Sequence, residues 1–481
     1  MIPVVIVGGG IAGLSAAYEL HARGVPFMLV ERGPRAGGVI LSEQIDGFTL
    51  DGGPDALLIQ KPEGVALCRE LGLGDRLVPT RPPRVAYILR RGVLHPLPDA
   101  SVLGIPTRVG PFVRTRLFSW PGKLRMGMEL FVPARRDESD ESIGHFIERR
   151  FGHEAKAYLA EPLLAGIHAG DVDRLSVKAL FPRFAAAERK YGSLLKAFRA
   201  QAAAARAAGR SPSVDGAFLS LPDGLSEMVR ALVQALPPES IRLNTAATRV
   251  VPDPREDRGA NGGGRDGEGT FRVELAAGET LEAQAVVLAA PAYVAGTLVR
   301  EADADLARLC EEVPYASSAT VALGFRRDAV GHPLHGSGFL VPRVEELGIL
   351  AASWLSSKWP GRAPGDRVLV RTFVGGARDP GALARTDAQL VSLSLDAIRP
   401  LLRIDGAPIL THVYRWSRAN AQHDVGHVER MEAIERRLTA HPGLFVTGSG
   451  FRGVGIPDCV ADARATAAKV TEWLRPTSVR P

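Results

Sequence analysis

The sequence predicts a mixed α/β (α+β) protein in which a Rossmann-type dinucleotide-binding domain is interwoven with a mixed-sheet substrate domain and a helical insertion. Three observations predict this fold class. A glycine-rich turn joins two apolar runs at the N-terminus, several β-type runs lie between Phe325 and Val374, and another strand-to-glycine turn occupies residues 443–450. At 481 residues the chain exceeds the roughly 250 to 300 residues that one core usually supports, so we expect more than one unit.

The N-terminal unit begins with a predicted strand over residues 2–7 that runs into Gly8-Gly9-Gly10-Ile11-Ala12-Gly13. A helix over residues 14–23 and a second strand over 26–30 complete one βαβ unit. The first, second and third glycines of the G-x-G-x-x-G pattern permit a tight turn, backbone approach to a pyrophosphate, and close packing of helix on strand. The helix N-terminus offers free N–H groups to phosphates. This unit therefore predicts a dinucleotide site.

The second strand ends on Glu31, 18 residues after Gly13, where a carboxylate can accept hydrogen bonds from ribose hydroxyls. A solvated charge at a strand end is the alternative. Arg32 follows, and then Gly37-Gly38-Val39, in which the glycine pair permits a ligand to approach the backbone closely. A nicotinamide site does not require this extension.

With these residues the unit resembles the flavin amine oxidase superfamily, in which FAD extends past the first βαβ unit through Glu-Arg and Gly-Gly segments. The resemblance implies a non-covalent FAD whose flavin end is closed by the strand 444–447 and the glycines after it. It implies further cofactor contacts from Gly53, Pro54, Asp55, Ala56, Val250, Ser449, Val454, Gly455 and Ile456. Cys459 suggests covalent flavin attachment as an alternative, but a small buried residue that opens a helix explains it better.

Four further segments resemble the protoporphyrinogen oxidase family. In chain order they are residues 51–55, 94–98, 163–176 and 454–459. The resemblance implies FAD-dependent oxidation of protoporphyrinogen IX to protoporphyrin IX in haem biosynthesis, by stepwise hydride transfer to flavin with O2 as acceptor. The cofactor supplies the chemistry and the protein supplies position and desolvation, so a missing catalytic triad does not argue against an enzyme.

The same resemblance assigns four substrate residues. Arg84 matches a basic residue for a propionate, which its fork can bind bidentately; a solvated arginine is the alternative. Leu340 and Phe373 would pack against pyrrole rings, and both also suit a core. Gly166 matches a glycine whose backbone carbonyl is directed at the tetrapyrrole, which implies a catalytic role. A glycine that ends a helix would give the same sequence pattern. His168 is not assigned as a base.

The predicted domains are discontinuous. We expect an FAD-binding domain, a substrate-binding domain and a helical insertion, formed respectively by residues 1–60 with about 215–300 and 420–475, about 61–95 with 301–419, and about 96–214. Within the insertion we expect helices over residues 134–152 and 194–209. Elsewhere, β-type runs over 241–251 and 270–275 predict a hairpin whose Gly-rich tip lies between them.

The insertion carries much of the net charge of +6. From Arg108 to Arg136 it contains seven Lys or Arg against one acid, Glu129, interleaved with aromatic residues. This pattern suits an anionic bilayer surface, as the resemblance also implies; a packed helical region with solvated arginines is the alternative. No nucleic-acid motif accompanies the charge.

Several further expectations complete the prediction. The three cysteines are far apart and no histidines have ligand spacing, so we predict neither disulfide nor metal. The N-terminus has no signal-peptide pattern, which predicts a cytoplasmic protein. Because of the basic run, we expect it to lie peripherally on the cytoplasmic face of the membrane; a homodimer is left open. Three alternatives to the main function remain: coproporphyrinogen III as substrate, another amine oxidase-type enzyme acting on amines or carotenoid precursors, and a non-catalytic FAD-binding membrane or partner module.

Overall fold

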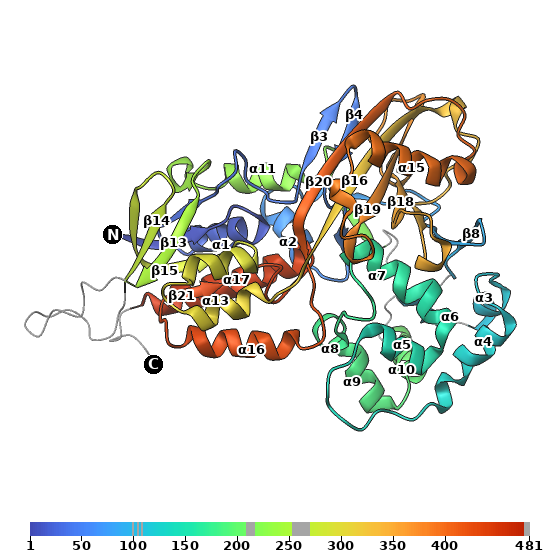
Figure 1. Cartoon of the computed structure of the whole chain (residues 1–481), viewed down its shortest axis with the longest axis horizontal. Helices are drawn as coiled ribbons and strands as arrows, with labels where there is room; N and C mark the ends of the chain where they lie inside the picture. The colour runs from blue at the N-terminus through green and yellow to red at the C-terminus, as the bar shows by residue number, and fades with distance from the viewer. Residues whose placement is uncertain (99–100, 103–104, 107–108, 208–216, 253–269, 476–481) are drawn as a thin grey trace, which may run out of the picture.

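The computed structural model describes residues 1–98, 101–102, 105–106, 109–207, 217–252 and 270–475. Two seven-stranded sheets lie side by side, each with its own helices, and a helical region lies beside the second sheet (Figure 1). The predicted mixed α/β fold class is confirmed. The gly-rich tip over residues 253–269 and the end of the helix predicted to reach residue 209 lie outside the described residues.

The first sheet has the strand order β12-β2-β1-β15-β14-β13, with β21 also paired to β15. Its strands are β1 (Ile2–Val7), β2 (Phe27–Val30), β12 (Ile241–Arg242), β13 (Ala247–Pro252), β14 (Phe271–Leu275), β15 (Thr280–Leu288) and β21 (Leu444–Val446). The pairs that join β12, β2, β1, β15 and β21 are parallel, whereas β13, β14 and β15 form an antiparallel meander.

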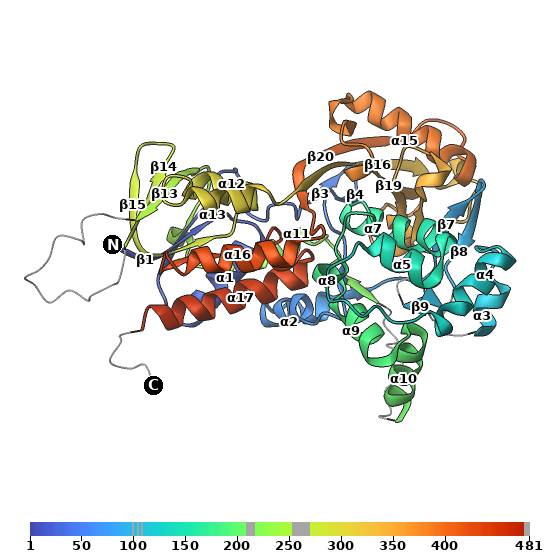
Figure 2. The ribbon, with the colours of Figure 1, turned by 60° about the horizontal axis from the view of Figure 1, so that its bottom comes forward.

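Alternation along β1 builds a core on each face of this sheet. Val4 and Ile6 face α1 (Ile11–Ala22), α2 (Glu63–Glu70), α11 (Ser226–Gln234) and α17 (Ile456–Trp473). Val5 and Val7 face α12 (Ala292–Val299), α13 (Ala304–Glu311) and α16 (His427–Leu438). Figure 2 shows α17 running alongside α1. A strand buried on both faces needs apolar residues at every position, which explains the unbroken apolar run at the N-terminus.

The strand predicted over residues 241–251 is divided into β12 and β13. Between them, the backbone N–H groups of Asn244 and Thr245 donate to the carbonyls of Gly33 and Glu31, at 2.9 and 2.8 Å. These long-range bonds replace ladder bonds, so one continuous strand was the wrong prediction. They also bring the start of β13 beside the end of β2.

The second sheet has the order β20-β16-β19-β18-β17-β7-β8. Its strands are β7 (Ala86–Arg90), β8 (Val93–Pro96), β16 (Tyr315–Arg326), β17 (Gly338–Leu340), β18 (Ala351–Trp354), β19 (Arg367–Gly375) and β20 (Leu410–Ala421). Helix α15 (Asp387–Leu402) packs on one face, where Leu390 and Ile398 join the core. The sheet predicted between Phe325 and Val374 is confirmed and extends at both ends.

Smaller sheets connect these parts. They are β3 (Ser42–Ile45) with β4 (Phe48–Asp51), β5 (Leu57–Leu58) with β11 (Phe218–Ser220) and β6 (Val78–Pro79), and β9 (Ser101–Val102) with β10 (Ile105–Pro106). The small sheet of β5, β11 and β6 brings residues before and after the helical region together. Strand pairing alone does not divide a chain into domains, so the predicted domain limits stay a prediction.

In its described residues, the helical region contains eight α-helices and a π-helical turn over Lys156–Ala160. The helices are α3 (Val109–Arg114), α4 (Trp120–Gly127), α5 (Ile143–Phe151), α7 (Glu161–His168), α8 (Val177–Leu180), α9 (Pro182–Tyr191) and α10 (Leu194–Ala207), besides the short α6 (His153–Ala155). The helix predicted over 134–152 is wrong for residues 134–142. Ser142 caps α5, its Oγ accepting from His145 N at 3.2 Å, so the helix starts there.

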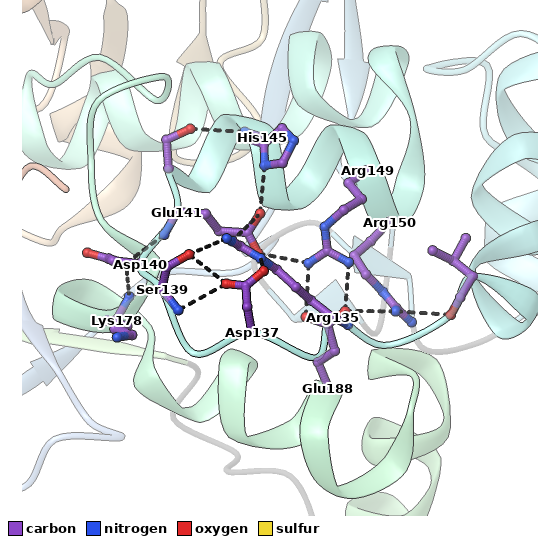
Figure 3. Close-up of polar contacts among 12 residues, drawn as sticks. Arg135, Asp137, Ser139, Asp140, Glu141, His145, Arg149, Arg150, Lys178 and Glu188 are labelled. Carbon is purple, nitrogen blue, oxygen red and sulfur yellow. Dashed lines mark hydrogen bonds and ion pairs between the residues drawn. The ribbon is translucent and has the colours of Figure 1, made fainter.

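Buried ion pairs hold this region together (Figure 3). Arg150 on α5 is fully buried and pairs with Glu129 and with Glu188 on α9. Arg149, next to it, pairs with Glu188 at 2.7 Å and with Glu141 at 2.8 Å. Loss of one member of such a network leaves an uncompensated buried charge, which costs about 3–5 kcal/mol. Part of the basic content of the insertion therefore serves its own packing.

Candidate active site

The turn between β1 and α1 has the geometry that its glycines predict. Gly8 has φ +112° and donates its N–H to Val30 O at 2.9 Å. A Cβ on Gly13 would lie 1.9 Å from Gly8 O, so this glycine is required where the helix packs on the strand. A Cβ on Gly10 would meet nothing within 4 Å. The N-terminus of α1, at Ile11 and Ala12, is thus open to a phosphate, as the pyrophosphate of FAD requires.

The Glu31 carboxylate lies beside this turn. Its Oε2 accepts from Gly9 N and its Oε1 from Gly33 N, each at 2.7 Å. Both bonds fix the carboxylate at the end of β2, and the remaining lone pairs can accept from ribose hydroxyls. Arg32 is exposed. Val250 on β13 is buried in the core, so only its backbone is available for a cofactor contact.

The glycine pair after β2 closes against the turn. Gly37 N donates to Gly9 O at 2.7 Å, and a Cβ on Gly38 would lie 3.3 Å from the Cα of Gly10. Gly37 and Gly38 have φ +104° and +57°, a region that suits glycine. Val39, which follows, is 41% exposed. Apolar surface and open backbone thus lie next to the proposed pyrophosphate position.

The segment Gly53-Pro54-Asp55-Ala56 is held from the second sheet. Arg371 on β19 donates to Gly53 O at 2.7 Å, to Asp51 O at 2.5 Å and to the Asp55 carboxylate at 3.0 Å. Asp55 also accepts from Lys358 at 2.6 Å and from Trp359 at 2.8 Å. Burial opposes ionisation of Asp55, but Lys358 and Arg371 outweigh it and hold its pKa below the usual range.

This arrangement changes the role of Asp55. Its carboxylate is bonded to three protein donors, so any contact between this segment and FAD comes from the backbone or from Pro54 and Ala56, which are partly exposed. The sequence reasoning missed Arg371, Lys358 and Trp359. They lie more than 300 positions after Asp55, and no local pattern marks their contact with it.

The C-terminal glycine loop meets the N-terminal turn. A Cβ on Gly448, which has φ +110°, would lie 3.4 Å from the Cβ of Ala12. Asp462 on α17 fixes the start of this loop, its Oδ2 accepting from Thr447 Oγ1 at 2.7 Å and from Gly448 N at 3.1 Å. Ser449 follows in the loop, and at its end Val454, Gly455 and Ile456 lead into α17, the first two partly exposed. The two ends of the chain therefore build one site.

Cys459 on α17 lies close to this loop. It is buried, and burial raises the pKa of its thiol to about 12. Its Sγ–H donates to Gly453 O at 3.3 Å. A protonated, buried thiol is a poor nucleophile, which supports non-covalent FAD binding.

Three of the predicted substrate residues are neighbours. Leu340 pairs with Ala351, which pairs with Phe373, so the three side chains lie in one row across β17, β18 and β19. A Cβ on Gly166 of α7 would lie 2.7 Å from Leu340 Cδ2, and Phe373 packs against the cluster of Ala165, Ala169 and Leu350. The row and α7 therefore form one apolar surface, with Arg371 4.7 Å from the Phe373 ring.

Arg84 lies at the edge of this surface. It is exposed, lies two residues before β7, and donates through Nε to Thr80 O at 2.9 Å. Ile88 of β7 pairs with Leu340, so the Arg84 backbone lies ~13 Å along the strand from that position. A guanidinium so placed can bind a carboxylate at the periphery of a large ligand.

Three histidines lie where α7, β20 and the glycine loop converge. His168 ends α7, its carbonyl accepting from Gln422 Nε2 at 2.9 Å. Burial, together with a smaller contribution from the nearby His423, lowers the pKa of His168 to about 4. Burial also lowers the pKa of His423, to about 3. Both imidazoles are therefore neutral at pH 7. The sequence reasoning did not single out His423 or its neighbour His427.

The carboxyl ends of β1, β2, β15 and β21 lie at one edge of the first sheet, where α/β proteins bind nucleotide cofactors. Residues 11–471 match the flavin containing amine oxidoreductase family. The chain belongs to that family, and it is an FAD-dependent oxidoreductase. The predicted cofactor and the resemblance to flavin amine oxidases are confirmed.

Individual proteins and a solved structure resemble this chain over almost its whole length. Coproporphyrinogen III oxidase of Bacillus subtilis (strain 168) is 34% identical over 98% of each chain. Protoporphyrinogen oxidase 1, chloroplastic, of Spinacia oleracea is 29% identical over 98% of this chain and 84% of its own. A crystal structure from Exiguobacterium sp. 255-15 matches with TM-score 0.83 and 31% identity over 98% of both chains. Among the described residues, no helix is both long and apolar enough to cross a membrane.

Proposed function

We propose that this chain oxidises a porphyrinogen to the corresponding porphyrin with FAD, in the biosynthesis of haem. The observation that carries the proposal is the apolar row Leu340-Ala351-Phe373, with Leu340 against Gly166 of α7. The end of α7 is linked to the glycine loop through Gln422 and His423. The names of relatives that match along almost the whole chain support it. Electron acceptance by O2, giving peroxide, is part of the proposal.

Bound FAD supplies the acceptor for a hydride from a methylene carbon of the substrate, while a pyrrole nitrogen loses a proton. The chain's own residues provide position. Leu340 and Phe373 offer apolar surface to pyrrole rings, and the missing Cβ of Gly166 leaves room for Leu340, since a Cβ there would lie 2.7 Å from Leu340 Cδ2. Arg84 binds a propionate and sets the orientation of the macrocycle. A porphyrin results after three such two-electron steps.

Coproporphyrinogen III is the substrate that we favour. Its name belongs to the relatives of Bacillus subtilis and of Propionibacterium freudenreichii, each 34% identical to this chain, against 29% for the spinach protoporphyrinogen oxidase. Protoporphyrinogen IX is the second candidate, because the spinach protein also matches 98% of this chain. The two differ in the number of propionates, so charge at the edge of the apolar surface would discriminate between them.

The test is turnover of each porphyrinogen by the purified holoenzyme, followed by porphyrin fluorescence. We expect the higher kcat/KM with coproporphyrinogen III. Arg84→Ala should raise KM several-fold with little change in kcat, since the residue binds the substrate and takes no part in the chemistry. Arg91→Ala is the matched control, because Arg91 is also exposed but lies at the far end of β7. Oxidation of neither porphyrinogen would refute the proposed function.

We also propose that the helical region binds a membrane surface peripherally, on the cytoplasmic side. Exposed apolar residues follow one another on α3, α4 and the turn Met128–Phe131 at the outer edge of this region (Figures 1 and 2). They are Val113, Trp120, Leu124, Met128 and Phe131, of which Leu124 is 71% and Phe131 84% exposed. Spacing of four residues puts Trp120, Leu124 and Met128 on one face.

The basic residues contribute less to this surface than their number predicts. Lys123 is buried and donates to Val113 O at 2.8 Å, Arg125 donates to backbone carbonyls at the end of α5, and Arg135 pairs with Asp137. Arg114 and Arg136 are exposed. We therefore expect membrane binding that depends more on apolar insertion than on anionic lipid.

Co-sedimentation with vesicles tests this surface. We expect binding to phosphatidylglycerol vesicles, partial binding to phosphatidylcholine vesicles, and loss of both in Leu124→Ser/Phe131→Ser. Ile409→Ser is the control, because Ile409 is also an exposed apolar residue, 45% exposed, but follows α15 on the second sheet. Equal sedimentation of the double variant and the parent protein would contradict the proposed surface.

A further inference from the structure

His423 and His427 form a stacked pair between the end of β20 and the start of α16. Their ring centroids are 3.8 Å apart and the ring planes differ by 10°. Both side chains are buried, 3% and 2% exposed. The Nε2 of His423 lies 2.9 Å from Ser449 O, and that of His427 lies 2.8 Å from Phe451 O. Because a carbonyl only accepts, each imidazole carries its proton on Nε2.

The surroundings keep both rings neutral. Burial and the proximity of His427 lower the pKa of His423, and burial lowers that of His427. Asp458 on α17 and His168 on α7 face His423, while Arg430 on α16 faces His427. The Nδ1 of His427 is buried without a hydrogen-bond partner among the described residues. The pair is therefore suited to donate two hydrogen bonds and unsuited to exchange protons.

These two bonds determine how the glycine loop is oriented. In a trans peptide the carbonyl and the following N–H point in opposite directions. When the carbonyls of Ser449 and Phe451 point toward the imidazoles, the N–H groups of Gly450 and Arg452 point away from them. Asp462 fixes the preceding Thr447 and Gly448 from α17. The loop is thus held from two sides, with its first glycine against α1.

We propose that His423 and His427 are positioning residues that hold the loop 448–455 in the conformation that closes the flavin end of the FAD site. The proposal rests on the placement of the flavin at that loop. The imidazoles act through the loop backbone, to which their Nε2 atoms donate. Removal of a donor would leave a buried carbonyl unpaired and allow the loop to turn.

The experiment uses His423→Phe and His427→Phe, which keep an aromatic ring in the stack but remove the donor, and His423→Gln, which keeps an amide donor. Apoprotein is titrated with FAD, and both the dissociation constant and the visible absorption spectrum of the bound flavin are measured. We expect each Phe variant to weaken FAD binding about tenfold and to shift the flavin spectrum. His423→Gln should restore both toward the parent values.

His412→Phe is the matched control, because His412 also packs against an aromatic ring, Tyr414, at 4.6 Å on β20, but has no bond to the loop. Its FAD affinity and spectrum should equal those of the parent. Should His423→Phe not fold, as judged by circular dichroism, His427→Phe provides the comparison. Parent-like affinity in a folded Phe variant would overturn the proposal, and so would weaker binding with an unchanged flavin spectrum.

These readouts do not depend on porphyrinogen turnover. Weaker FAD binding with a shifted spectrum supports the positioning role even if neither porphyrinogen is oxidised, in which case only the proposed function fails. Conversely, porphyrinogen oxidation by a protein whose Phe variants bind FAD normally would retain the function and remove the two histidines from the site.

Discussion

Replacement of Arg371 by Met tests how the second sheet supports the cofactor segment. Arg371 is 1% exposed, and its guanidinium bonds to the Asp55 carboxylate and to the carbonyls of Asp51 and Gly53. Met fills a similar volume but offers no donor. The variant therefore leaves two carbonyls without these donors and leaves Asp55 with Lys358 and Trp359 only.

The expected cost follows from these bonds. A hydrogen bond to a charged group contributes about 1.5–3 kcal/mol, and removal of one member of a buried ion pair costs about 3–5 kcal/mol. We expect Arg371→Met to lower the free energy of unfolding by about 3–5 kcal/mol. Asp55→Asn should cost at least as much, because it leaves the charges of Arg371 and Lys358 without their carboxylate partner. Coupling between the two changes should be about 2 kcal/mol.

A double-mutant cycle measures this coupling. Urea unfolding of the parent, both single variants and Arg371→Met/Asp55→Asn is followed by tryptophan fluorescence, for which Trp359 beside Asp55 is a local reporter. Arg367→Met, on the same strand but partly exposed, is the control and should change stability by no more than about 0.5 kcal/mol. Strict additivity of the two single changes would refute the ion pair and the reasoning built on it.

Three further outcomes are expected. Gly13→Ala should abolish FAD retention, since its Cβ would lie 1.9 Å from Gly8 O, whereas Gly110→Ala, with nothing within 4 Å, should retain FAD; absorbance of the purified proteins decides. The pKa of His168 is lower in the folded chain, about 4, than its unfolded value of about 6.5, so the unfolded chain binds more protons and stability falls as pH drops from about 6.5 to 4. Urea midpoints at pH 7.5 and 4.5 should differ less in His168→Gln; an equal difference would contradict the assignment. Cys459→Ser should keep its FAD. Acid precipitation of the parent protein should leave its flavin in the supernatant, whereas flavin in the pellet would indicate a covalent bond.

Local sterics explain which elements the sequence predicts well. The strand over residues 2–7, the turn from Gly8 to Gly13 and the helix after it agree with the structure because each depends on neighbours in the chain. The glycine at position 13 is required by a carbonyl only five residues away. Such short-range requirements can be recognised in the sequence itself.

Failures occurred where distant groups competed for the backbone. The strand predicted over 241–251 is interrupted because Asn244 and Thr245 bond to the end of β2. The helix predicted from residue 134 begins at Ile143, after a segment in which the backbone N–H of Arg135 donates to the distant Glu188 carboxylate at 3.3 Å. The helix and strand propensities of the residues in each segment give no information about such long-range contacts.

Part of the candidate site could likewise be predicted from the sequence, and part could not. By itself, the sequence determined the dinucleotide turn, the acidic end of the second strand and the FAD family, because glycine sterics and carboxylate chemistry are properties of the residues themselves. Only the tertiary structure decided that Asp55 is bonded to Arg371 and Lys358, and that His423 and His427 donate to the closing loop. Those partners meet through the packing of separate sheets and helices, and a buried polar group is satisfied by whichever donor the fold brings to it.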